Sequence, residues 1–196
     1  MIRILTPADY RVMPWKNGGG TTTEIHIHPP GAGWDAFDWR VGIADIAQSG
    51  PFSSFAGIDR SIMLLERPPD SGMRLAIDGR DVDLPLGEFV DFAGESTPYG
   101  TLLGAPVRDF NVMSRRSRVR HERGCVGLGA GAAHHLPAAA WTFVHAIAGD
   151  ATVVSGPERA ALSTGESAVI DGSAPVSVIA GRDGSRIVWA VFSPAI

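Results

Sequence analysis

The segment from residue 73 to residue 92, MRLAIDGRDVDLPLGEFVDF, carries the pattern that decides the fold. It alternates short strands with turns, in the order Met73–Asp78, Gly79, Val82–Leu84, Gly87-Glu88 and Phe89–Phe92. Short strands separated by glycine turns are typical of β-sandwiches and barrels. This segment therefore predicts an all-β unit.

The same order of strands and turns returns in the last third of the chain. Its parts are Thr142–Ala148, Gly149-Asp150, Thr152–Val154, Gly165-Glu166 and Ser167–Asp171. The two copies share the order of their strands and glycine turns but not their individual residues, which indicates two related β units. Two such units in a chain of 196 residues predict a compact double barrel, with residues 1–115 in the first unit and residues 116–196 in the second.

The composition agrees with many short strands and excludes several functions. The chain has 24 glycines and 14 prolines, and turn formers in this number favour strands over helices. Its formal net charge of −4 gives no electrostatic reason to bind nucleic acid or an anionic membrane. The single cysteine, Cys125, excludes an internal disulfide framework. The first residues, MIRILTPADYR, lack the apolar stretch of a signal peptide, so we expect a cytoplasmic location.

Two histidines form a candidate metal site. His26 and His28 lie two residues apart on a predicted strand, and strict alternation places both on the face of Glu24. Gly20 followed by this His-x-His pair matches the start of the cupin metal motif. The carboxylate and the later histidine that the motif also needs are missing, so we expect no metal and no other cofactor. A metal-dependent cupin enzyme, an isomerase or dioxygenase using Glu24, His26 and His28, is the alternative hypothesis.

A polar set without metal is the stronger candidate for a site. Gly42 and Ala44 share the face of Arg40, so its guanidinium has room to cross a cavity. Arginine presents a planar fork of donors that suits a carboxylate. Similar polar side chains recur in glycine-flanked loops and on strand faces, and together they predict a ligand pocket at the mouth of a barrel. The predicted ligand-binding residues are Lys16, Asn17, Thr22, Glu24, Arg40, Ser53, Asp59, Arg60 and Asn111.

Four ordered blocks of sequence resemble the HutD/Ves family. They are PWKNGGGTTTEI at residues 14–25, FDWRVGIA at residues 37–44, GPFSSFAGIDR at residues 50–60 and DFNVM at residues 109–113. The resemblance implies a cytoplasmic bicupin, that is, two double-stranded β-helix (cupin-type) barrels in one chain. It also implies a link to histidine-utilisation genes and to stress responses, a regulatory role, and no assigned enzymatic reaction.

We therefore expect a binding protein rather than an enzyme, and we assign no catalytic residue. The expected ligand is a small carboxylate metabolite, and the resemblance points to a histidine-degradation intermediate such as urocanate or N-formylglutamate. No nucleic-acid or membrane partner is expected. A protein-interaction module is a third hypothesis, and the resemblance allows a homodimer. The sequence leaves open which unit the first strand joins, and whether the polar face of residues 22–28 points into the barrel.

Overall fold

The computed structural model describes residues 1–15 and 18–195. Within these ranges the chain forms strands β1 to β19 and one short 3-10 helix, so the predicted all-β class is confirmed. No helix of the described residues is long and apolar enough to cross a membrane. The chain divides into two compact units, which we call the pocket unit (Arg11–Val119) and the terminal unit (Met1–Tyr10 with Arg120–Ile196).

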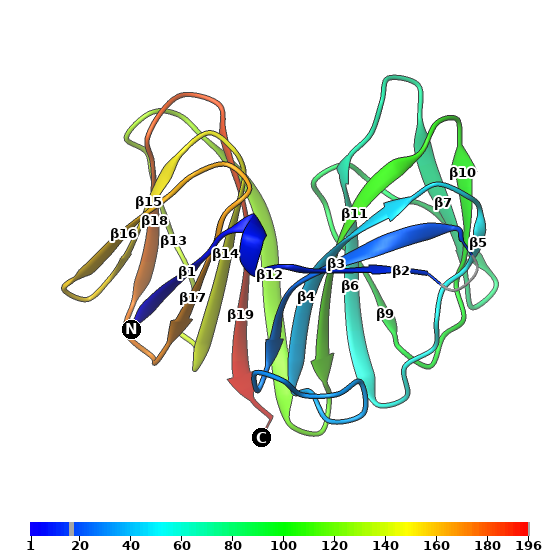
Figure 1. Ribbon diagram of the computed structural model, residues 1–196, viewed down its shortest axis with the longest axis horizontal. Helices are drawn as coiled ribbons and strands as arrows, with labels where there is room; N and C mark the ends of the chain where they lie inside the picture. The colour runs from blue at the N-terminus through cyan, green and yellow to red at the C-terminus, as the bar shows by residue number, and fades with distance from the viewer. Residues whose placement is uncertain (16–17, 196) are drawn as a thin grey trace. The chain divides into compact units, whose positions relative to one another are not determined.

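The pocket unit contains two sheets (Figure 1). The larger sheet has the strand order β2-β3-β4-β11-β6-β9, and the smaller has the order β5-β10-β7-β8. The strands of the larger sheet are β2 (Arg11–Pro14), β3 (Gly20–His28), β4 (Trp39–Ile46), β6 (Ile58–Glu66), β9 (Val90–Ala93) and β11 (Val107–Arg115). The strands of the smaller sheet are β5 (Gly50–Pro51), β7 (Gly72–Ile77), β8 (Arg80–Asp83) and β10 (Tyr99–Leu103).

The terminal unit also contains two sheets. One has the order β1-β17-β14-β19-β12, and the other has the order β13-β18-β15-β16. The strands of the first sheet are β1 (Ile2–Leu5), β12 (Val119–Leu128), β14 (Trp141–Ala148), β17 (Ser167–Asp171) and β19 (Ser185–Pro194). The strands of the second sheet are β13 (Ala133–His135), β15 (Ala151–Ser155), β16 (Glu158–Leu162) and β18 (Val176–Ala180). The 3-10 helix η1 (Pro7–Asp9) follows β1.

The two units share one strand order, as the repeated pattern predicts. The run β4-β11-β6-β9 corresponds to β12-β19-β14-β17, and β5-β10-β7-β8 corresponds to β13-β18-β15-β16. The predicted match of individual strands is wrong for its first two strands. It set β7 against β14 and β8 against β15, whereas the equivalents of β14 and β15 are β6 and β7. The error arose because β16, an edge strand with mostly exposed residues, shows no apolar alternation. The two Gly-Glu turns do fall at equivalent places, before β9 and before β17.

The core of the pocket unit lies between its two sheets. In β7 the side chains of Met73, Leu75 and Ile77 are buried while Arg74 and Ala76 are exposed, which is the alternation of a strand with one face inward. These three side chains pack in one cluster with residues of the larger sheet. An equivalent cluster of buried side chains joins both sheets of the terminal unit.

A hydrogen-bonded chain anchors the first ten residues within the terminal unit. Strand β1 pairs antiparallel with β17, and Tyr10 follows η1. The Tyr10 hydroxyl donates to the backbone oxygen of Gly165 at 2.8 Å and lies 2.9 Å from Oγ of Ser167. Oγ of Ser167 lies in turn 2.9 Å from Nδ1 of the buried His145. Burial raises the pKa of Tyr10 to about 12 and lowers the pKa of His145 to about 4, so both side chains are neutral near pH 7.

Removing the Tyr10 hydroxyl is expected to loosen this anchor. Tyr10→Phe removes the hydroxyl donor of the Gly165 carbonyl and leaves the Ser167 hydroxyl with His145 as its remaining partner, so we expect the free energy of unfolding to fall by about 1–2 kcal/mol. Urea denaturation measures this change. Tyr99→Phe is the matched control, because Tyr99 is about half exposed and its loss of a hydroxyl should leave stability unchanged. Equal effects of the two substitutions would contradict the prediction.

Candidate functional site

A cavity of about 670 Å³ lies in the pocket unit. Its floor is formed by residues of β4, β6 and β11, three neighbouring strands of the larger sheet. Register aligns these strands in three rows, Arg40–Met113–Arg60, Gly42–Asn111–Ile62 and Ala44–Asp109–Leu64, of which Ile62 and Leu64 pack in the core instead of lining the cavity. The small residues Gly42 and Ala44 leave the space that Arg40 needs, as the alternation predicted. A Cβ atom at Gly42 would lie 2.9 Å from the carbonyl oxygen of Thr23, so the close approach of β3 also requires glycine there.

Arg40 is buried in the floor with its charge already paired. Its side chain is 6 % exposed, and its Nε donates to Oε2 of Glu24 on β3 at 2.6 Å. The Trp34 ring lies over the guanidinium, with its centroid 4.3 Å from Cζ. Nη2 is buried and has no hydrogen-bond partner among the described residues. Arg40 lines the cavity, and its guanidinium keeps an N–H donor that no described residue satisfies.

Arg60 is the second buried arginine of the floor. Its Nη1 donates to the backbone oxygen of Ser53 at 3.0 Å, and its guanidinium lies over the rings of Phe92 and Phe55 at 4.9 and 5.3 Å. Its Nε is buried without a partner in the described part of the chain. Burial lowers the pKa of Arg60 to about 10, while the charge of Asp109 opposes the shift and that of Arg40 adds to it. Arg60 therefore stays cationic at neutral pH.

Asp109 supplies the opposite charge. The residue is fully buried, and neither carboxylate oxygen has a well-formed hydrogen bond to a described residue. Burial raises the pKa of Asp109 to about 7, and the charge of Arg60 and the backbone amide of Ala44 oppose this shift only in part. Oδ1 of Asn111, on the same face of β11, is also buried without a partner among the described residues. Unsatisfied buried polar atoms are rare, and several around one cavity indicate a binding site.

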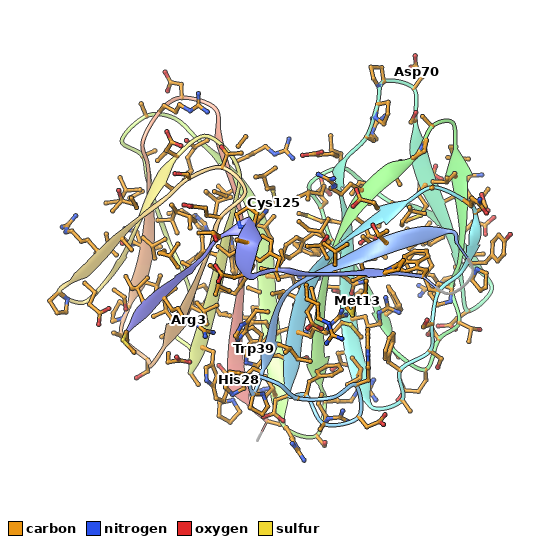
Figure 2. The ribbon with its side chains drawn as sticks, in the orientation of Figure 1. Arg3, Met13, His28, Trp39, Asp70 and Cys125 are labelled. Carbon is orange, nitrogen blue, oxygen red and sulfur yellow. The ribbon has the colours of Figure 1, made fainter. Side chains whose placement is uncertain are left out.

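A β-bulge separates Glu24 from the two histidines. The partner of Glu24 on β4 is Gly42, and the partner of His26 is Val41, so Ile25 is the extra residue. One extra residue inverts the alternation, and His26 and His28 therefore point away from the face of Glu24. His28 stacks on Trp39 with ring centroids 5.4 Å apart (Figure 2). The expectation that these three side chains share one face is wrong, and the described residues include no cluster of three metal-ligating side chains.

The structure brings together most of the predicted binding residues. Thr22, Arg40, Ser53, Arg60 and Asn111 line the cavity, and Glu24 holds Arg40 from the neighbouring strand. Asp59 does not line it, because adjacent residues of a strand point to opposite faces, and its carboxylate instead accepts from Arg116 Nε at 2.7 Å. The predicted residues Lys16 and Asn17 lie outside the described residues.

Asp109, Trp34 and Trp15 are among the cavity residues that were not predicted as binding residues. Asp109 stands two residues before Asn111, so strand alternation alone could have placed both on one face. Trp34 lies in the loop between β3 and β4, where side chains do not alternate regularly and their direction cannot be predicted from spacing. Trp15 donates from its indole N–H to Thr22 Oγ1 at 2.8 Å, and only the pairing of β2 with β3 brings these two residues together.

A family model described as HutD matches residues 7–188. The chain belongs to the HutD family. The resemblance of the four sequence blocks to HutD/Ves is thereby confirmed. The "Uncharacterized 21.2 kDa protein in hutC 3'region" of Pseudomonas putida is 46% identical over 121 residues, or 61% of this chain and 61% of the relative. Protein Ves of Citrobacter koseri is 39% identical over 119 residues, or 57% of this chain and 59% of the relative.

Solved structures extend the HutD likeness to nearly the whole chain. A conserved protein of unknown function from Pseudomonas aeruginosa PAO1 has a TM-score of 0.90 at 30% identity, over 98% of this chain and 99% of its own. HutD from Pseudomonas fluorescens SBW25 has a TM-score of 0.81 at 31% identity, over 100% of both chains. A cupin 2 conserved barrel domain protein from Leptotrichia buccalis has a TM-score of 0.58 at 10% identity, over 91% of each chain, and shows likeness of fold alone. This HutD-family chain is thus an all-β protein with a cupin-like fold and a family link to histidine utilisation.

Proposed function

We propose that this HutD-family protein binds a small carboxylate metabolite in the cavity of the pocket unit. The observation that carries the proposal is the pair of buried guanidinium groups, Arg40 and Arg60, each with an N–H donor that lacks a partner among the described residues. A carboxylate is the acceptor that such donors fit best, and their bonds to it are charge-assisted. The aromatic residues Trp34 and Phe52 also line the cavity.

In this proposal the two units form a bicupin, with a cupin-type barrel in each unit. The family link to histidine utilisation makes the acids of that pathway the first ligands to test, among them urocanate and N-formylglutamate. Formate joins them because the solved HutD of Pseudomonas fluorescens is described as a formate condition. Binding would regulate or report the flux of the pathway, with no reaction catalysed.

A thermal-shift series on tag-free protein tests the proposal. The ligands are urocanate, N-formylglutamate, glutamate, histidine, formate and divalent metals, each with and without EDTA. A ligand that binds only the native state raises the melting temperature, by several degrees at one hundred times its Kd. We expect such a shift with at least one carboxylate, unchanged by EDTA.

Variants of two arginines locate the binding. Arg60→Gln removes a cavity donor and should abolish the shift, whereas Arg108→Gln removes an exposed arginine that pairs with Asp45 and should leave it intact. Absence of a shift with every carboxylate would refute the proposal. A shift that occurs only with a divalent metal would replace it with the metal-dependent alternative.

A further inference from the structure

Among the described residues, the charged side chains in and beside the cavity balance one another when Asp109 is ionised. Glu24 pairs with Arg40, and the charge of Arg60 acts directly on Asp109. These four side chains carry no net charge when all are ionised. A bound anion would add an uncompensated charge in a medium that screens charge poorly, and such a charge is costly. A ligand with one positive and one negative group would keep the balance.

The polar atoms that lack partners are sorted along the cavity floor. The N–H donors, on Arg40 and Arg60, belong to the row that also holds Met113. The acceptors, on Asn111 and Asp109, lie progressively farther along β11. Asp109 and Met113 are four positions apart, which separates their Cα atoms by about 13 Å along a strand. In the strand register, the residues with free donors therefore share one row of the floor, and the residues with free acceptors lie in the two rows beyond it.

We infer that the ligand of this cavity is a zwitterion, with its carboxylate on Arg40 and Arg60 and a protonated amine on Asp109 and Asn111. The inference rests on the proposed function. It narrows the ligand class from carboxylates to molecules that carry both a carboxylate and an ammonium group. Both ends form charge-assisted hydrogen bonds, which are the strong ones. An ammonium group at Asp109 also favours the ionised carboxylate that burial opposes.

Matched ligand pairs test the inference, because each pair differs in a single ammonium group. The probes are the ω-amino acids from glycine to 6-aminohexanoate against the carboxylates from acetate to hexanoate, and 4-(aminomethyl)benzoate against 4-methylbenzoate. The aromatic pair suits the aromatic walls. Binding to the full chain is followed by the fluorescence of its tryptophans, of which Trp15 and Trp34 border the cavity.

We expect at least one amino acid to bind with a Kd at least tenfold lower than its matched carboxylate. Asp109→Asn should reduce that preference below threefold, whereas Asp35→Asn, at an exposed position, should retain it. Carboxylates that bind as well as their amino counterparts in every pair would overturn the inference and leave the proposed function standing. Failure of every amino acid to bind would overturn it as well. Failure of every carboxylate in the thermal-shift series would refute the proposed function itself.

Discussion

Asp109→Asn is expected to stabilise the protein by about 2–3 kcal/mol more at pH 8 than at pH 5, relative to the wild type. The folded pKa of Asp109 is about 7, above its ordinary value of 3.8. The unfolded chain therefore releases this proton at a lower pH than the folded chain does, and wild-type stability is lost as pH rises from about 4 through 7. Asparagine does not titrate, so the variant avoids this loss.

Urea denaturation of both proteins at the two pH values measures the difference. Arg60 is cationic at pH 5 and at pH 8, since its pKa is about 10, so its own titration adds nothing to the difference. Its attraction for the ionised Asp109 is already contained in the folded pKa of Asp109. The surface substitution Asp35→Asn is the control, and it should change stability by less than ~0.5 kcal/mol. A pH-independent effect of Asp109→Asn would mean that Asp109 titrates as it does in the unfolded chain. A gain in stability when a buried ionisable group is replaced by a neutral one is typical of functional sites, where function and stability oppose each other.

Arg40→Met is expected to lower the free energy of unfolding by about 3–5 kcal/mol, because it leaves Glu24 as an unpaired charge with little access to water. The Glu24 side chain is only 14 % exposed. The double variant Arg40→Met with Glu24→Gln should recover most of the loss, since no unpaired charge remains. A double-mutant cycle by urea denaturation at pH 7 gives the coupling free energy of the pair.

The exposed pair Arg74 and Asp83 provides the matched control. Its Nε–Oδ1 distance is also 2.6 Å, but both side chains are about half exposed or more. Solvent screening leaves such pairs with little coupling. The same cycle on Arg74→Met and Asp83→Asn should therefore show a far smaller coupling. Equal coupling in the two pairs would contradict the view that burial makes Glu24 dependent on Arg40.

Much of the site could be predicted because β-strands alternate. The alternation placed Arg40, Gly42 and Ala44 on one face, and the structure puts all three in the cavity. Arg60 and Asn111 were predicted as binding residues from the polar side chains that recur in glycine-flanked loops and on strand faces. Asp59 was wrongly joined to its neighbour Arg60, although adjacent strand residues point to opposite faces.

Local sequence by itself determined the all-β class, the repeated order of strands and the family, because alternation, glycine turns and short motifs act over a few residues. Tertiary structure decided three other features. The bulge at Ile25 turned the histidines away from Glu24, and bulges arise from how neighbouring strands fit together. The pairing of β1 with β17 joined the first ten residues to a partner more than 150 residues away. The burial that shifts the pKa of Asp109 depends on every strand around the cavity, so it exists only in the folded chain.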